Sequence, residues 1–317
     1  MSSTLEGVVL AGAQIGFVVM AAPLLNGVIK KLKARLQLRQ GPPLLQGYAD
    51  LAKWLSKSEQ VAESTSFVHR LAPVGILAAV LTATLFLPLF GDQTPVSKSG
   101  DLLVVVGLFA LGRALLTLAG MDSGASFGQM GSSREVAIGS LVEPVLLMSL
   151  VALTLEPQST RLGEIVAFGD RNPGVFLGLG WALAAAAFCL VLVAETGRIP
   201  VDNPDTHLEL TMVHEAMLIE YSGRSLGMLH YAAMIKQLLL AVVLANVFLP
   251  FGMARLDGAA GYLIGASLVS LKVGLIGVGL ALTESAFAKM RLFQLPDLIG
   301  AAGASACLGV AVTVLFA

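Results

Sequence analysis

Apolar stretches long enough to cross a membrane recur along nearly the whole chain. A transmembrane helix needs roughly 20 predominantly apolar residues to span the ~30 Å hydrocarbon core of a bilayer. Eight such stretches can be placed, at residues 6–29, 69–90, 101–121, 135–155, 174–194, 226–249, 259–284 and 296–316. They are continuous and do not alternate between polar and apolar positions, which excludes a transmembrane β-barrel.

The overall composition indicates the same class of protein. Of the 317 residues, 56% are hydrophobic and only 13% are charged, whereas about a quarter of the residues in a soluble domain are charged. The mean hydropathy is +0.82. We therefore expect an all-α polytopic membrane protein with about eight transmembrane helices, forming a single transmembrane domain over residues 1–317.

The basic residues predict how the chain is oriented in the membrane. Thirteen lysines and arginines fall in the loops after the odd-numbered stretches, against four on the other side: Lys98, Arg161, Arg171 and Arg255. Because cytoplasmic loops carry the excess of basic residues, residues 30–68 and 195–225 are predicted to be cytoplasmic and both termini to lie outside. No cleavable signal peptide is expected, since the first stretch ends in a lysine cluster.

The two cysteines argue against a redox centre in this chain. Cys189 and Cys307 lie inside predicted spans without a CxxC partner, so no iron–sulfur cluster, nickel site or structural zinc is expected. We expect both to pack as small apolar side chains between helices. Since GxGxxG, Walker A and GxSxG patterns are also missing, no catalytic residue, metal or bound cofactor is predicted.

The first cytoplasmic loop predicts an amphipathic helix on the membrane surface. After Gly41-Pro42-Pro43, apolar residues recur at helical spacing from Leu44 to Leu55, with Lys53 on the polar side. Two roles are open for this helix. Its lysines suit an anchor that contacts lipid phosphates, whereas the rigid Gly-Pro-Pro turn favours a docking face for a cytoplasmic partner.

Five ionisable side chains fall inside the predicted spans: Arg113, Glu143, Lys236, Lys272 and Glu284. An unpaired central charge costs at least ~2.5 kcal/mol in hydrocarbon on insertion scales, so each should face the bundle interior, water or a partner charge. Mutual pairing for structural support is one interpretation, and it suits Arg113 and Glu284 best. A proton path is the other, because a buried lysine can lose a proton and a buried carboxylate can gain one.

Residues 195–224 form a long acidic segment with six carboxylates, two histidines and two arginines. Gly197 and Pro200 end the preceding span, and Asp202-Asn203-Pro204-Asp205 supplies turn and N-cap residues for a helix over about 206–221. Neighbouring carboxylates can share protons and titrate near neutral pH. His207 and His214 are an alternative metal pair, but two helical turns separate them by about 10 Å, too far to bind one ion together.

The segment AETGRIPVDNPDTHLELTMVHEAMLIEYSGR, from Ala194 to Arg224, resembles the signature loop of a known membrane subunit. This is the large eight-helix subunit shared by respiratory complex I and the membrane-bound energy-converting [NiFe]-hydrogenases, including formate hydrogenlyase. The resemblance extends to RQGPPLLQGYADLAKWLSKSE in the first loop, GSSREVAIGSLVEPV at the fourth span and KMRLFQLPDLIG before the last span. Together these matches reach from about residue 30 to residue 300.

The wording of the loop separates two branches of that family. GRIPVDNPDTHLELTMVHEAM is similar to the hydrogenase and formate hydrogenlyase branch. The quinone-reducing branch carries an FD-x-x-E-x-E-x-E-L run and a YRYDQL-type sequence. Residues 201–204 (VDNP) and 292–295 (LFQL) depart from both of these quinone-branch patterns. The resemblance therefore argues against a quinone headgroup site.

The resemblance implies roles for individual residues. Glu143 matches a buried glutamate of the fourth span. Carboxylates of the signature loop link the cytoplasmic redox module to proton channels, and the matching residues are Glu195, Asp202, Glu209 and Glu220, with Glu215 in the same segment. Basic positions where the soluble subunits dock are matched by Arg39, Lys53, Arg198 and Arg291. Lys236 and Lys272 have no motif match and are proton-path candidates on burial alone.

The resemblance implies a non-redox membrane subunit of a multi-subunit oxidoreductase in a bacterial or archaeal cytoplasmic membrane. Its expected partners are hydrogenase-like large and small subunits with iron–sulfur proteins, which carry the iron–sulfur clusters and a [NiFe] centre, antiporter-like membrane subunits and lipid, but no nucleic acid. The chain would couple their electron transfer to proton or sodium translocation. Three rivals are open: a quinone-site subunit of an NADH–quinone oxidoreductase, a free-standing ion transporter and a purely structural anchor.

Overall fold

The computed structural model describes residues 2–61, 65–96, 101–175, 178–202, 213–251, 258–290 and 294–316. Every regular element in these ranges is a helix, and a single isolated bridge joins Asp101 to Arg161. The helices are α1 (Ser2–Leu36), α2 (Gln46–Ser56), α3 (Phe67–Phe86), α4 (Leu102–Asp122), α5 (Ser126–Val151), α6 (Leu162–Arg171), α7 (Leu179–Glu195), α8 (His214–Leu218), α9 (Gly223–Val242) with its π-helical extension η2 (Val243–Phe248), α10 (Gly258–Ala286) and α11 (Leu295–Phe316).

The predicted class, an all-α polytopic membrane protein, is confirmed. Six helices of the described residues are long and apolar enough to cross a membrane: α1, α3, α4, α9 with η2, α10 and α11. Two further helices, α5 and α7, occupy predicted spans but are too short or too charged to be counted among these six. α7 has 17 residues, and α5 carries Arg134, Glu135 and Glu143, so the number of eight transmembrane helices stays a prediction.

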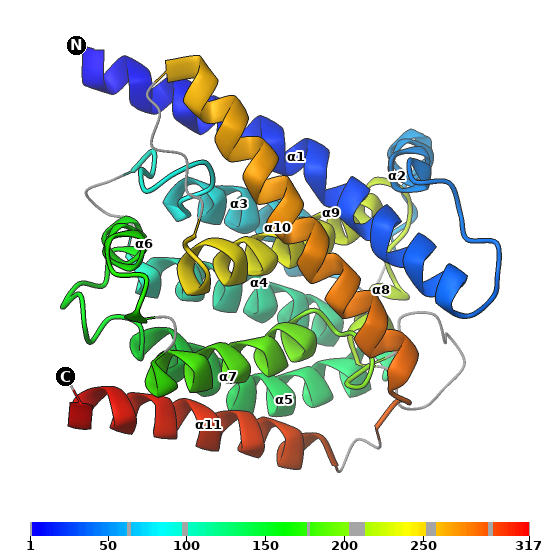
Figure 1. Cartoon of the computed structure of the whole chain (residues 1–317). Helices are drawn as coiled ribbons and strands as arrows, with labels where there is room; N and C mark the ends of the chain where they lie inside the picture. The colour runs from blue at the N-terminus through cyan, green and yellow to red at the C-terminus, as the bar shows by residue number, and fades with distance from the viewer. Residues whose placement is uncertain are drawn as a thin grey trace.

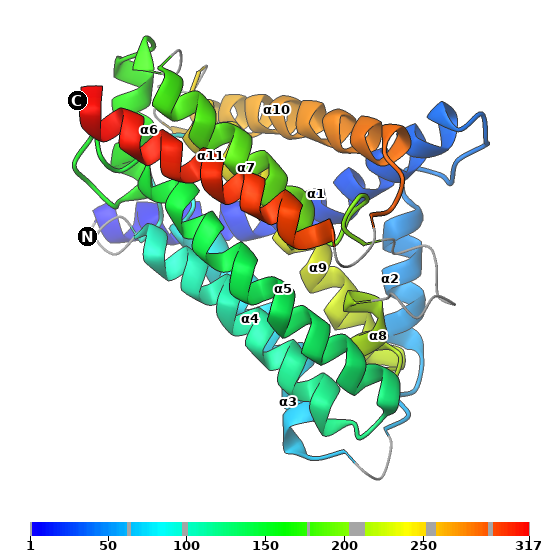
Figure 2. The ribbon, with the colours of Figure 1, turned by 90° about the horizontal axis from the view of Figure 1, so that it is seen from below.

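The long helices pack around α9. In Figure 1, α1 and α10 cross one side of the bundle, α5, α7 and α11 lie on the opposite side, and α9 runs between them. In α9 with η2, 78% of the span is buried inside the protein, against 28% in α10 and in α11. Figure 2 shows α1 beginning and α11 ending at the same end of the bundle. α9 is therefore the central helix, and Lys236 in its middle lies inside the bundle, whereas Arg224 in its first turn is exposed.

The outer helices present apolar side chains to their surroundings, as helices facing lipid do. Leu263 and Leu275 of α10 and Leu315 of α11 are more than half exposed. Cys189 and Cys307 were expected to pack between helices, but both are exposed on the bundle surface. Cys307 still contacts Met148 of α5, at 3.5 Å. A thiol behaves as a small apolar group, so hydrocarbon accommodates it there as well as a helix interface would.

The elements predicted to be cytoplasmic agree with the sequence predictions in part. The predicted amphipathic helix is confirmed as α2, whose Leu51 is buried while Lys53 is exposed. The predicted helix over 206–221 lies partly outside the described residues, and the part described contains the short α8. Sequence analysis did not predict α6, which buries Leu162, Ile165 and Val166 against the bundle.

Candidate functional site

A cluster of five charged side chains lies inside the bundle and joins four helices. Arg113 of α4 contacts three carboxylates: Glu195 at the end of α7, Glu143 of α5 at 2.8 Å and Glu135 of α5 at 3.2 Å. Lys236 of α9 donates a hydrogen bond of 2.6 Å to the second oxygen of Glu195. We call these five residues the Glu195 cluster. Glu195, with a side chain 2% exposed, is its most buried member.

The spacing of α5 creates room for the guanidinium of Arg113. Glu135 and Glu143 are eight residues apart, about two helical turns, so they extend from the same side of α5. Gly139 lies midway, and a Cβ added there would be 2.7 Å from Nη1 of Arg113. The missing side chain therefore lets Arg113 lie against α5 between two carboxylates, where its planar donors contact both.

The charges of the Glu195 cluster do not balance. With all five groups ionised, three carboxylates face two cations, and one negative charge is left over. Surplus charge in a poorly solvated site is unfavourable unless a further positive charge compensates it. The side chain of Glu143 is 35% exposed, against 18% for Glu135 and 2% for Glu195. Glu143 is therefore the carboxylate through which the cluster is most open to its surroundings.

A second cluster surrounds Arg198, three residues after Glu195. Arg198 donates to Glu284 of α10 at 2.7 Å, to Asn26 of α1 at 2.9 Å and to Gln237 of α9 at 2.7 Å. Lys33 of α1 lies 3.1 Å from the other oxygen of Glu284. We call this group the Arg198 cluster. It ties the segment after α7 to α1, α9 and α10.

The inward direction of Arg198 follows from the turn before it. Gly197 has a φ of +57°, a conformation that glycine adopts without a steric penalty, and the chain reverses there. The side chain of Arg198 then enters the bundle and is buried. A docking contact with a soluble partner, the role predicted for Arg198, is therefore not the role that these contacts favour.

The two clusters adjoin along α9, because Lys236 belongs to one and Gln237 to the other. Oε1 of Gln237 accepts from Arg198, whereas its buried Nε2 has no hydrogen-bond partner among the described residues. A buried polar atom of this kind usually bonds an ordered water.

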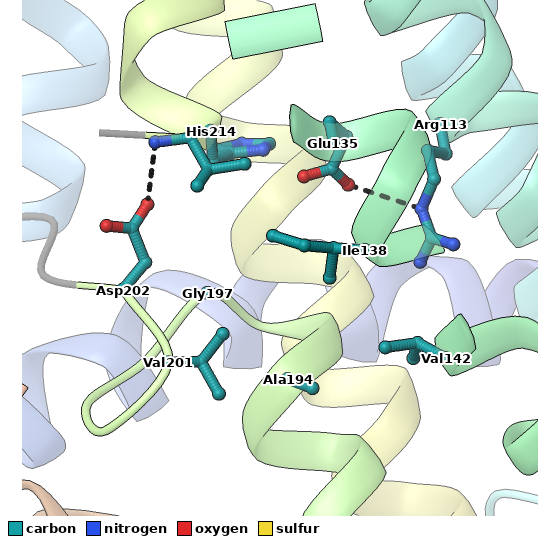
Figure 3. Close-up of a pocket in the computed structure, with 10 residues that line it drawn as sticks. Arg113, Glu135, Ile138, Val142, Ala194, Gly197, Val201, Asp202 and His214 are labelled. Atoms are coloured by element: carbon teal, nitrogen blue, oxygen red, sulfur yellow. Dashed lines mark hydrogen bonds and ion pairs between the residues drawn. The ribbon is translucent and has the colours of Figure 1, made fainter. Parts of the chain in front are cut away.

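A small cavity opens between the Glu195 cluster and the acidic segment (Figure 3). Its volume is about 20 Å³, which is enough for about one water molecule. Arg113 and Glu135 line one side of it, and Asp202 and His214 line another. Asp202 accepts a hydrogen bond of 3.3 Å from the backbone of Val213, and Lys289 lies 3.3 Å from its other oxygen.

The remaining predicted site residues are distributed more widely. Glu215 and Glu220 are half-buried around α8, while Arg39 and Lys53 are exposed. Lys272 contacts neither cluster: its ammonium donates to the carbonyls of Ala245 and Leu249, at 3.2 and 2.8 Å, around η2. The predicted residues outside the described ranges are Glu209 and Arg291.

Sequence analysis missed two kinds of residue in these clusters. Glu135 was not predicted as a site residue, although the spacing Glu135, Gly139, Glu143 marks one face of a helix. Asn26 and Gln237 are neutral amides inside apolar stretches, and nothing in the sequence predicts their contact with Arg198. Among the described residues, no three His, Cys, Asp or Glu side chains lie close enough together to hold a metal ion.

Comparison with known proteins relates the chain to membrane subunits of redox complexes. A family model described as NADH dehydrogenase matches residues 9–315. Hydrogenase-4 component C of Escherichia coli (strain K12) is 34% identical over 287 residues, covering 90% of this chain and 89% of the relative. Formate hydrogenlyase subunit 4 of the same strain is also 34% identical, covering 86% and 87%.

More distant similarity reaches two other kinds of complex. NADH-quinone oxidoreductase subunit 8 of Rhodothermus marinus is 26% identical, covering 74% of this chain and 72% of that one. A chain in the structure of the membrane-bound sulfane sulfur reductase, an archaeal respiratory membrane complex, superposes with a TM-score of 0.83 at 21% identity. That match covers 99% of this chain and 100% of the other, and it shows a shared fold.

Proposed function

The chain belongs to the NADH dehydrogenase family, and on that premise we propose that it is the membrane subunit of an energy-converting complex of the hydrogenase-4 and formate hydrogenlyase type. It anchors a cytoplasmic arm that carries iron–sulfur clusters and a [NiFe]-type centre. It couples electron transfer in that arm to translocation of protons or sodium ions through its carboxylates. The chain itself holds no redox centre and acts as an enzyme only within the complex.

The observation that carries this proposal is the charge imbalance of the Glu195 cluster. A purely structural ion cluster would be expected to balance, because unpaired buried charge costs several kcal/mol. Here Arg113 and Lys236 hold three carboxylates between them. Binding of a proton or a sodium ion would neutralise the surplus charge, and carboxylate oxygens can bind either ion. The structural-anchor rival leaves this surplus unexplained.

The geometry supports an ordered path through the clusters. Asp202 and His214 face the cavity from the acidic segment, and Glu135 and Arg113 face it from the bundle. A water in the cavity would pass a proton from the first pair to Glu135. Glu143, the most exposed carboxylate of the cluster, would then pass it to a neighbouring antiporter-like membrane subunit. Uptake of a proton weakens the hold of Arg113 on its partners, which links protonation to the packing of α4 against α5 and α7.

The quinone-reducing branch is the alternative, and two observations favour it less. Identity to the hydrogenase-type relatives is 34% over about nine tenths of the chain, against 26–30% over 69–74% of the chain to the quinone-type relatives. The cavity beside the Glu195 cluster has room for about one water and is too small for a quinone headgroup.

Orientation and domain organisation belong to the same proposal. Both termini would lie on the outer side of the cytoplasmic membrane, and residues 30–68 and 195–225 on the cytoplasmic side. α1 begins and α11 ends at the same end of the bundle in Figures 1 and 2, which supports a shared side. Helices packed around one central α9 support a single transmembrane domain.

The test starts with the complex that contains the chain. Tagged chain is purified from its native membrane in mild detergent, and the co-purifying proteins are identified by mass spectrometry. A hydrogenase-like large subunit, iron–sulfur proteins and an antiporter-like chain are expected. NADH-oxidising flavin subunits would favour the quinone alternative, and a chain that purifies alone would favour a free-standing transporter.

The coupling role is tested on the same complex in sealed vesicles. Glu143→Gln should leave electron transfer intact and slow ion translocation on the order of 100-fold, the contribution of a positioned proton-transfer group. Glu164→Gln is the matched control, since Glu164 forms an exposed pair with Arg161 at the start of α6 and belongs to neither cluster. Assays with and without sodium identify the ion. Unchanged translocation in Glu143→Gln would remove Glu143 from the path.

A further inference from the structure

Helix α1 ends in a turn that places leucine where glycine is normally found. The backbone of Arg39 donates to the carbonyl of Ala34 at 2.8 Å, and Leu38 donates to Arg35 at 3.0 Å. This pair of bonds is the Schellman motif, whose left-handed position is usually glycine. Here that position is Leu38, with a φ of +58°. For a residue with a Cβ, this backbone conformation costs about 1–2 kcal/mol.

The side chain of Leu38 gains nothing from its own chain in return. It is 97% exposed, the highest value among the large apolar side chains of the described residues. Leu36, two residues before it, is 49% exposed. A strained backbone that presents an apolar side chain to its surroundings is expected where another molecule covers that side chain.

Lipid does not account for this exposure. α1 has 35 residues, about 52 Å of helix, whereas the hydrocarbon core is ~30 Å thick. After the buried Ile29, the helix continues through Lys30, Lys31 and Lys33, so Leu38 lies about 10 Å beyond the apolar span. Figures 1 and 2 both show the end of α1 and the following loop projecting beyond the neighbouring helices.

The loop that carries Leu38 is held against α1 at two points. A Cβ on Gly41 would lie 2.9 Å from Cβ of Ala34, and one on Gly27 would lie 2.3 Å from the carbonyl oxygen of Leu44. The backbones are therefore in direct contact at both glycines. Leu38 is held in one position, which lowers the entropy lost when a partner binds.

The surroundings of Leu38 are basic. Arg35 and Arg39 flank it and are exposed, and residues 7–49 contain no aspartate or glutamate. We propose that Leu38 is the central contact of a docking surface, comprising Arg35, Leu36, Leu38 and Arg39, for a cytoplasmic protein subunit that offers an apolar pocket rimmed by carboxylates. The inference rests on the proposed function, since it assigns the place where the soluble arm is held.

Two substitutions separate docking from folding. Leu38→Gly relieves the strained backbone, and Leu38→Asn keeps a residue that tolerates the left-handed conformation. Both should leave the Tm of the isolated chain unchanged or higher. Both should weaken rebinding of the detached soluble arm on the order of 30-fold, the loss typical of a central interface contact. Gln158→Gly is the matched control, because Gln158 is also exposed with a φ of +52°. It should likewise leave the Tm unchanged or higher, but it should not change the binding of the soluble arm.

The outcomes distinguish this inference from the proposed function. If the unaltered chain binds no soluble redox subunits, the proposed function is wrong and the docking surface with it. If it binds them and both Leu38 variants bind them equally well, only the docking surface is wrong. If the variants retain the subunits but lose co-purified anionic phospholipid, the occupant is lipid and the proposal is overturned. Binding that weakens with salt in the unaltered chain is expected from Arg35 and Arg39.

Discussion

Lys236, in the middle of α9, donates a hydrogen bond of 2.6 Å to Glu195, the last residue of α7. The other oxygen of that carboxylate faces Arg113 on α4. One buried carboxylate thus joins three helices, and each of its oxygens contacts a different cation. This arrangement makes Glu195 sensitive to any change in either cation.

The loss of stability caused by replacing Glu195 should be partly reversed when Lys236 is replaced as well. Glu195→Gln leaves two buried cations with one carboxylate fewer, and loss of one partner from a buried pair destabilises by ~3 kcal/mol or more. Adding Lys236→Met removes one unpaired charge, so the double variant should have a higher Tm than Glu195→Gln alone. Thermal unfolding of the purified chain measures this. A double variant less stable than both single variants would contradict the pairing.

Arg198→Lys should destabilise although it keeps the charge. An ammonium can still pair with Glu284, but it lacks the planar fork that also reaches Asn26 and Gln237. Each buried amide left unsatisfied costs about 1–3 kcal/mol. A Tm several degrees below that of the unaltered chain is expected. Arg39→Lys is the control, since Arg39 is exposed, and an equal loss in both variants would show that the cluster contributes nothing specific.

Gly223→Ala should separate the first cytoplasmic loop from α9. Gly223 has a φ of +51°, and a Cβ there would lie 2.6 Å from the carbonyl oxygen of Ser58. Strain and the clash together should lower the Tm and speed proteolysis of the loop after α2. Gly279→Ala in α10 is the comparison, because no atom lies within 4 Å of its added Cβ. Its Tm should stay the same or rise slightly.

Tyr221 should make the protein less stable at alkaline pH. Burial raises the pKa of its phenol, and the charges of Asp122 and Glu59 add to this. Because the folded-state pKa is the higher one, the contribution is fully present below the unfolded value of about 10 and is lost as pH rises through the folded-state pKa. Tyr221→Phe should flatten the alkaline limb of a plot of Tm against pH.

The same substitution should also lower the Tm near neutral pH. The Tyr221 hydroxyl donates a hydrogen bond of 3.0 Å to the carbonyl of His69, and its loss costs about 1 kcal/mol. An alkaline limb as steep in Tyr221→Phe as in the unaltered chain would assign the pH dependence to another group.

Labelling from one side of the membrane tests the orientation. In a chain with Cys189 and Cys307 replaced by alanine, Ser56→Cys at the end of α2 and Gln158→Cys after α5 each provide one exposed thiol. A membrane-impermeant maleimide applied to intact cells should label Gln158→Cys, and Ser56→Cys only after the cells are opened. The reverse pattern would place both termini in the cytoplasm.

The helices could be predicted from sequence because lipid imposes one rule on every span. The stretch predicted at 101–121 is α4 at Leu102–Asp122, since a continuous apolar run has few alternatives in a membrane. α6 was missed because its apolar positions, Leu162, Ile165 and Val166, cover only one short face. Short amphipathic segments depend on what they pack against, which sequence does not reveal.

The candidate site could be predicted as a set of residues but not as a set of pairs. Arg113, Glu143 and Lys236 could be predicted as site residues because each lies in an apolar run, where a charge is costly to bury. Lys236 is 41 residues from Glu195, and only the packing of α7 against α9 brings them together. For Arg198 the sequence led to the wrong location. Its position in a loop predicted a side chain at the surface, but the left-handed turn at Gly197 directs that side chain into the bundle.

The wide turn of η2 sets the rotational phase of the end of the central helix. A π-helical turn accommodates one more residue than an α-helical turn, and each residue of an α-helix advances the side chains by about 100°. Within this turn Asn246 donates to the carbonyls of Pro88 and Leu89, at 2.8 and 2.9 Å. Deleting one residue here would restore an ordinary helix and rotate Asn246 away from both carbonyls, so the length of this segment is constrained as well as its buried side chains.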